Sequence, residues 1–139
     1  MIKIKKISDD MIMPKRMECG SSGVDLFSPI KFYLYPKQLK IIKLGFAIEI
    51  PYGFEWQIRP RSSMSKKDIL TYFGTIDSSY RGDICVLLKN LSMDQYLIDR
   101  GYRIAQAVLC QVNMCNNFVL VDELSKTKRG TGGFGSTGK

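Results

Sequence analysis

Phe54-Glu-Trp-Gln-Ile58 alternates apolar and polar residues, which is the pattern of a strand that buries one face. The turn Pro51-Tyr-Gly53 precedes it, and residues 38–50 before that turn are rich in β-branched and aromatic side chains. Residues 83–88 and 104–112 have the same character, and residues 31–35 and 118–121 are shorter β candidates. With roughly eight to ten strands expected, the sequence predicts an all-β sandwich or barrel.

The remaining organisation is simple. Only residues 62–70 read as helical, and Ser63 is placed to cap that helix. A chain of 139 residues fits one domain with a real core. The β pattern stops near Ser125, so we divide the chain into a β domain, residues 1–124, and a C-terminal arm, residues 125–139.

The arm ends in Arg129-Gly-Thr-Gly-Gly-Phe-Gly-Ser-Thr-Gly-Lys139, in which five of eleven residues are glycine. Glycine costs about 0.5–1 kcal/mol in a regular element, so this run is expected outside helices and strands. Bare backbone can direct N–H groups at phosphate oxygens, Arg129 can donate to phosphate through two N–H groups, and Phe134 offers a flat face to a ring. The alternative is a disordered glycine- and serine-rich tail.

The composition excludes several classes of protein. No apolar run is long enough to cross a membrane or to act as a signal peptide, so export is not expected. The chain has four cysteines without a CxxC pair and no histidine, which argues against structural zinc and favours a reducing compartment. The absence of histidine also removes Ser-His-Asp and Cys-His catalysis. A general base must therefore be a carboxylate, a tyrosine or a lysine.

The formal net charge of +8 indicates polyanionic partners, and both nucleotides and nucleic acids qualify. The basic residues are scattered along the chain, so a solvated basic surface also explains most of them. No nucleic-acid recognition motif is present, and direct nucleic-acid binding is not expected.

Two segments carry candidate chemistry. Gly74-Thr-Ile-Asp-Ser-Ser-Tyr-Arg-Gly-Asp83 reads as a hairpin whose tip presents Asp77 and Tyr80, although an ordinary hairpin with a turn aspartate is the alternative. Arg61 and Ser62 open the expected helix and form an anion site in principle. A helix start with a surface arginine is the alternative there.

Two polar residues lie inside strand-like runs. Asp25 could hold a hydrated Mg²⁺ near phosphates, or be a hydrogen-bonded surface residue. Gln106 stands among apolar residues and needs a hydrogen-bond partner, either a ligand or a neighbouring loop.

Five motifs occur in order: SSGVDLFS, RPRSSMS, GTIDSSYRGDI, GYRIAQAVL and RGTGGFGSTGK. Together they resemble the five motifs of the trimeric deoxyuridine triphosphatase (dUTPase) family across residues 21–139. The resemblance implies an all-β jelly-roll, or distorted β-clip barrel, with one short helix and a glycine-rich arm. It also implies an intracellular homotrimer whose active sites are shared between subunits, with the arm closing over a neighbour's site. The implied reaction is hydrolysis of dUTP to dUMP and pyrophosphate with Mg²⁺, which limits uracil in DNA and supplies dUMP for dTMP synthesis.

The resemblance also implies roles for individual residues. Asp77 resembles the residue that activates the attacking water, Tyr80 the aromatic that excludes a 2′-hydroxyl, and Asp25 the carboxylate that reaches magnesium through water. Gln106 resembles a residue that supports the phosphate and water site. The other expected substrate-binding residues are those of the second, third and fifth motifs: Arg61, Ser62, Ser63, Gly74, Thr75, Ile76, Arg129, Phe134, Gly135, Ser136 and Thr137.

The chain departs from the family pattern at Ser63, Met64, Phe73 and Ser79. These changes concern the shape of the uracil pocket and leave Asp77 in place. Two other functions on this fold remain open: a regulatory or binding protein, and an enzyme related to dCTP deaminase. The intact third and fifth motifs favour dUTP hydrolysis.

Overall fold

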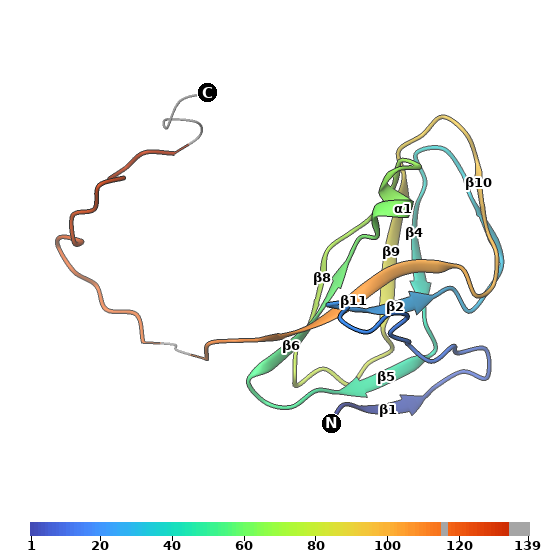
Figure 1. Cartoon of the computed structure of the whole chain (residues 1–139), viewed down its shortest axis with the longest axis horizontal. Coiled ribbons are helices and arrows are strands. Elements are labelled where there is room, and N and C mark those ends of the chain that lie inside the picture. The colour runs from blue at the N-terminus through green and yellow to red at the C-terminus, as the bar shows by residue number, and fades with distance from the viewer. Residues whose placement is uncertain (115–116, 134–139) are drawn as a thin grey trace.

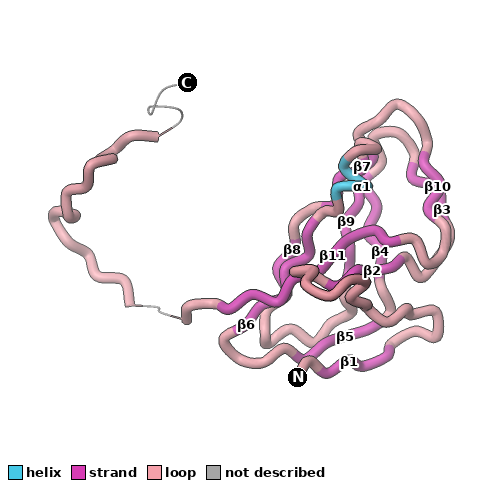
Figure 2. The backbone as a smooth tube through the Cα atoms, viewed as in Figure 1, coloured by secondary structure: helices cyan, strands magenta, loops and turns pink. Residues whose placement is uncertain are grey.

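The computed structural model describes residues 1–114 and 117–133. Within them the chain forms eleven strands and one helical turn, shown in Figures 1 and 2. The first six strands are β1 (Lys3–Lys6), β2 (Val24–Phe27), β3 (Phe32–Leu34), β4 (Leu39–Lys43), β5 (Phe46–Glu49) and β6 (Phe54–Arg59). The helical turn α1 (Ser62–Ser65) follows β6. The remaining strands are β7 (Ile69–Thr71), β8 (Gly74–Ile76), β9 (Cys85–Asn90), β10 (Tyr96–Ile98) and β11 (Arg103–Gln111).

The strands pair antiparallel in four small sheets. The largest has the order β2-β11-β6-β8, a second has the order β4-β9-β7, and β1 pairs with β5 and β10 with β3. The sheets do not close into one barrel within the described residues. The prediction of an all-β fold with one short helix is confirmed.

The core follows from the period of two along the strands. In β6, Trp56 and Ile58 are buried while the residues between them are only partly covered, as their alternation predicts. In β9, Val86 and Leu88 point inward in the same way. The buried hydroxyl of Thr71 in β7 donates to the backbone carbonyl of Ile104 in β11, at 2.9 Å. The two larger sheets therefore enclose a common core and are also bonded to each other.

The outer face of the β4-β9-β7 sheet carries exposed apolar side chains among lysines. Leu39 and Ile41 of β4 are 49% and 60% exposed, with Leu39 opposite Lys89 and Ile41 opposite Leu87 of β9. These two side chains lack a cover in the single chain.

The helix is shorter than expected. It spans only Ser62–Ser65, and its N-cap residue is Arg61, with no side-chain capping hydrogen bond, so the expected cap at Ser63 is wrong. Asp68 has φ 55°, a left-handed conformation that ends helical geometry, and Ile69 then enters β7 as a core residue. Burial of Ile69 in a strand outweighs the helical pattern of residues 66–70. No helix in the described residues is long and apolar enough to cross a membrane.

The expected strand at residues 118–121 is also wrong for the single chain. The described residues after β11 form no strand, and Phe118 and Leu120 are 94% and 100% exposed. Figure 1 shows residues 117–133 apart from the sheets, where no strand edge is available to pair with them. The boundary of the arm at residue 125 stays a prediction, while the last described strand ends at Gln111.

Candidate active site

A pocket of about 250 Å³ opens where β2, β11 and the start of α1 meet. We call it the arginine pocket. It brings together residues from three of the motifs, and its lining is Met17, Glu18, Ser21, Gly23, Asp25, Arg61, Ser62, Arg103 and Gln106. Strand pairing accounts for this, because β11 lies between β2 and β6, with Gln106 opposite both Asp25 and Arg59.

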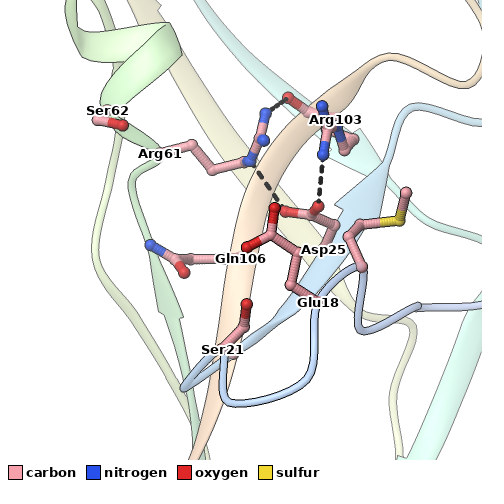
Figure 3. A pocket seen from close by; sticks show the side chains of 9 residues that line it. Glu18, Ser21, Asp25, Arg61, Ser62, Arg103 and Gln106 are labelled. Atoms are coloured by element: carbon pink, nitrogen blue, oxygen red, sulfur yellow. Dashed lines mark hydrogen bonds and ion pairs between the residues drawn. The ribbon is translucent and has the colours of Figure 1, made fainter.

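Asp25 lies between two guanidinium groups (Figure 3). Its Oδ1 atom is 2.9 Å from Nε of Arg61, and its Oδ2 atom accepts a hydrogen bond of 3.2 Å from Nη1 of Arg103. The side chains of Asp25 and Arg61 are only 13% and 18% exposed. The carboxylate is therefore paired and oriented within the pocket, which contradicts the alternative that it is a simple surface residue.

Arg61 is held at three points. Besides its ion pair with Asp25, its Nη1 atom donates to the backbone carbonyl of Arg103 at 3.1 Å and to Oγ of Ser63 at 3.2 Å. Among the described residues its Nη2 atom has no hydrogen-bond partner, so this end of the fork can donate to an anion. Ser63 thus positions Arg61, in addition to the substrate contact expected of it.

Arg103 is a site residue that the sequence analysis missed. It stands in the fourth motif beside the expected Gln106, yet its partner Asp25 is 78 positions away in the sequence. The signal that could have found it is an arginine at the start of a strand expected to pair with the strand of Asp25.

Gln106 has a partner in a neighbouring loop. Its Nε2 atom donates to the backbone carbonyl of Pro60 at 3.0 Å, next to Arg61. Gly23 allows this arrangement, because a Cβ there would lie 3.0 Å from the carbonyl oxygen of Ala107 and 3.2 Å from Oε1 of Gln106. Gln106 therefore fixes the backbone that carries Arg61.

The third motif forms a second pocket of about 250 Å³, the hairpin pocket, lined by Thr75, Ile76, Asp77, Tyr80, Asp83 and Cys85. Its strand β8 pairs with β6, with Gly74 opposite Ile58, whereas β9 pairs with β4 and β7. Since β8 and β9 do not pair within the described residues, the hairpin expected for residues 74–83 is wrong, and this segment is a loop that joins two sheets. The Tyr80 hydroxyl donates to the backbone carbonyl of Asp83 at 3.1 Å, and the Tyr80 N–H donates to the carbonyl of Asp77. The side chain of Asp77 is exposed and has no hydrogen bond within the described residues.

A thiol also lines the hairpin pocket. Burial, followed by the negative charge of Asp83, raises the pKa of Cys85 above its ordinary value. The thiolate that nucleophilic attack or metal binding needs is therefore disfavoured. Asp77 remains the candidate base of this pocket.

The two pockets have no lining residue in common. One chain thus brings Asp25, Arg61, Ser62 and Gln106 together, and separately Thr75, Ile76, Asp77 and Tyr80. Arg129 reaches neither group: it donates to the carbonyl of Gly132 at 2.9 Å within a local turn. The expected arm residues Phe134, Gly135, Ser136 and Thr137 lie outside the described residues.

The charges of the arginine pocket balance. Arg61 and Arg103 carry two positive charges, and Asp25 and Glu18 carry two negative ones. In the part of the chain that the structure describes, no three His, Cys, Asp or Glu side chains gather to hold a metal on their own. A strongly anionic ligand therefore needs positive charge from outside this pocket.

The chain is thus an all-β protein with a polar pocket built around two arginines and a separate loop that presents a carboxylate and a phenol. Comparison with known proteins then gives the family. The dUTPase family model matches residues 9–138, and the chain belongs to the dUTPase family. The resemblance of the five motifs is thereby confirmed.

Individual relatives support the same family assignment. The chain is 45% identical to the deoxyuridine 5'-triphosphate nucleotidohydrolase of Nautilia profundicola, over 99% of both chains. It is 44% identical to the protein of that name from Picosynechococcus, over 99% of this chain and 98% of the relative. Among solved structures, a mutant dUTPase of Staphylococcus bacteriophage 80alpha with dUpNHpp superposes with a TM-score of 0.93, at 27% identity and over 100% and 99% of the two chains.

Proposed function

We propose that the chain is a dUTP diphosphatase that hydrolyses dUTP to dUMP and pyrophosphate by attack of water on the α-phosphorus. Membership of the family and the names of its relatives support this reaction. The observation that carries it is the arginine pocket, where distant motifs supply Asp25, Arg61, Ser62 and Gln106 around one opening. A phosphate site requires several polar side chains around one opening, and residues of three motifs meet this requirement here.

In the arginine pocket, Arg61 and Ser62 bind phosphate oxygens of the substrate. Arg61 is preorganised for this role, because Asp25, Ser63 and the Arg103 carbonyl fix its guanidinium. Its Nη2 atom, which has no partner among the described residues, can then donate to a phosphate oxygen. A donor fixed before the substrate arrives loses little entropy on binding. Gln106 contributes by holding the backbone at Pro60.

In the hairpin pocket, Asp77 accepts the proton of the attacking water. Its side chain is exposed and makes no hydrogen bond within the described residues, so its carboxylate oxygens can accept this proton. Gly74, Thr75 and Ile76 read the uracil with backbone groups, and the Tyr80 ring packs against the deoxyribose where a 2′-hydroxyl would lie.

Mg²⁺ is the expected cofactor. The balanced charge of the arginine pocket leaves a triphosphate without net compensation, so further positive charge is required. The pocket offers the carboxylates of Asp25 and Glu18 and no histidine or thiolate, and hard oxygen donors suit Mg²⁺. Asp25 would hold the ion through water, and Arg129 of the arm would add a further charge at the phosphates. A bound Mg²⁺ supplies neutralisation of the phosphate charge.

The active form is a homotrimer with shared sites. Its first support is that the arginine pocket and the hairpin pocket, which the reaction needs together, have no lining residue in common in one chain. Its second support is the exposure of large apolar side chains at two separate places, Leu39 and Ile41 in β4, and Phe118 and Leu120 after β11. Further copies that cover these side chains, and bring their hairpin pocket to the first copy's arginine pocket, would explain both observations.

The decisive experiment is pyrophosphate release measured side by side with dUTP, dCTP, dTTP and UTP. We expect rapid release from dUTP and at least a hundredfold lower kcat/KM for the others. Ammonia release from dCTP would support the deaminase alternative, and binding of dUTP without turnover would support a regulatory protein. Nothing in the described residues favours either of these alternatives.

Mixed subunits test the shared site. A chain truncated after Ser125 lacks the arm, and an Asp77→Asn chain lacks the base, so each homotrimer should be nearly inactive. Because an arm from one chain can close over Asp77 of another, we expect activity to return when the two are refolded together. Two inactive parents that give inactive mixtures, with mixed trimers verified by mass, would contradict sharing. Full activity of the truncated protein alone would show that the arm is a plain tail.

A further inference from the structure

The Tyr80 ring lies directly against Gly82. A Cβ added at Gly82 would lie 2.3 Å from the Tyr80 hydroxyl oxygen, 2.5 Å from Cζ and 3.0 Å from Cε2. Ordinary contacts of a Cβ begin near 3.4 Å, so any side chain at this position would overlap the ring. The outer edge of the phenol thus rests on bare backbone.

The backbone conformation itself does not demand glycine at this position. Gly20, Gly45, Gly53, Gly101 and Gly130 have positive φ, and Gly82 is not among the described residues that do. Alanine could therefore adopt the local backbone geometry without strain. Among the described residues, the space taken by the Tyr80 ring is therefore what requires glycine at position 82.

The ring is also fixed from its two ends. At its base, the Tyr80 N–H donates to the Asp77 carbonyl at 3.1 Å. At its tip, the hydroxyl donates to the Asp83 carbonyl at 3.1 Å, and the Asp83 carboxylate accepts from the Gly45 N–H at 2.9 Å. Through Asp83 the ring is tied to the turn between β4 and β5, so it cannot shift without breaking these bonds.

We propose that Gly82 determines sugar specificity by setting the position of the Tyr80 ring in the hairpin pocket. This rests on the proposed function, in which that ring packs against the deoxyribose. A methyl group at position 82 must displace the ring by about 1 Å to reach normal contact distance. The ring then either enters the space of the sugar or turns out to solvent, and in both cases its fit against the 2′ position is lost.

The test compares the dUTP/UTP ratio of kcat/KM in Gly82→Ala with that of the unmodified enzyme. We expect the ratio to fall at least tenfold, with a higher KM for dUTP. Ser78→Ala is the matched control: it lies in the same loop, and its side chain makes no hydrogen bond within the described residues. The control should keep the ratio within twofold. A Gly82→Ala ratio within twofold of the unmodified enzyme overturns the proposal.

A double-mutant cycle isolates the contact. Once Tyr80→Ala has removed the ring, adding Gly82→Ala should change neither the ratio nor the melting temperature. A further tenfold fall in the dUTP/UTP ratio of kcat/KM when Gly82→Ala is added to Tyr80→Ala would mean that Gly82 acts through something other than Tyr80. That result would overturn the proposal. If Gly82→Ala alone fails to fold, folding of the double mutant supports the contact, and failure of both overturns it.

The two proposals fail in different ways. If the unmodified enzyme does not cleave dUTP, the proposed function fails, and a crystal structure of Gly82→Ala still tests whether the ring moves. A ring that stays in place there overturns the inference about Gly82. If the unmodified enzyme cleaves dUTP and rejects UTP while Gly82→Ala does the same, only the inference about Gly82 fails.

Discussion

The arginine pocket and the hairpin pocket are built in opposite ways. The contacts of Arg61, Gln106 and Arg103 in the arginine pocket join residues 42, 46 and 78 positions apart. The side-chain contacts of Tyr80 and Arg81 in the loop of residues 77–83 span only one to three positions. The arginine pocket therefore depends on side-chain contacts between distant parts of the sequence. The side-chain contacts of Tyr80 and Arg81 are local to one loop, although this loop is also tied to the sheets through β8 and through Asp83.

This difference predicts how each pocket responds to substitution. Breaking a contact in the arginine pocket removes a bond between β2, β11 and α1, so it should lower stability as well as activity. Changing an exposed side chain in the loop of residues 77–83 should lower kcat without changing the melting temperature. Substitutions at Asp77 and Asp25 test this division, and Lys67, which lines neither pocket, allows a comparison with a surface contact outside both.

Asp77→Asn should reduce kcat by roughly 10²–10⁴-fold, because a positioned general base contributes that much and an amide cannot accept the proton. The melting temperature should stay unchanged, since the Asp77 side chain is exposed and makes no hydrogen bond within the described residues. Asp94→Asn, the same change at another exposed site, is the control and should keep full activity. More than a tenth of the original kcat in the mutant would rule out Asp77 as the base.

Asp25→Asn should destabilise the fold. The amide carries no charge and turns an N–H group toward one of the two guanidinium groups, which loses charged hydrogen bonds worth about 1.5–3 kcal/mol. Denaturant unfolding at fixed protomer concentration measures the change. Asp99→Asn is the matched control: its 3.1 Å ion pair with Lys31 is of similar length, but both side chains are more than half exposed, so the loss should stay below about 1 kcal/mol. Equal losses at the two sites would contradict the contrast between the pockets.

Lys67→Met should have the smallest effect. Lys67 follows α1 and donates to the hydroxyls of Tyr96 and Tyr102, the latter at 3.0 Å, and these bonds raise its pKa. The hydrogen bond from Lys67, then that from Tyr96, lowers the pKa of Tyr102, while burial raises the pKa of Tyr96. Because the Lys67 side chain is exposed, loss of its hydrogen bonds at neutral pH should change stability by less than about 1 kcal/mol.

Alkaline titration shows the sign of the Lys67 effect. Tyr102 should begin to ionise below the ordinary tyrosine value of about 10, so its depressed pKa favours the folded state at high pH. The raised pKa of Lys67 favours the folded state up to the free lysine value of about 10.4, and this is lost as pH rises through the folded value. In Lys67→Met, tyrosine absorbance should rise at higher pH than in the unmodified protein, whereas Lys66→Met should match it. Identical curves would show that Lys67 does not bind Tyr102 in solution.

Local patterns in the sequence predicted what local physics controls. The alternation in residues 54–58 identified β6 and its buried Trp56 and Ile58. The hairpin expected for residues 74–83 does not form, because β8 pairs with β6 and β9 with β4 and β7. The pairing of Arg103 with Asp25 could not be predicted from the sequence, because it depends on which strands become neighbours in the sheet. The sequence pattern places Ile69 in a helix, but in the structure it is buried in β7. Its burial depends on packing against the core, which neighbouring residues in the sequence do not reveal.

The uncovered segment after β11 has a consequence for how long a lone chain survives. Phe118, Val119, Leu120 and Leu124 are almost fully exposed on backbone that forms no strand in the described residues. Extended, accessible backbone is what proteases cut most readily. Partner chains that cover it would remove the cleavage site, so resistance to digestion should increase with protein concentration. The rate of cleavage in this segment would then report how many of the chains are unassembled.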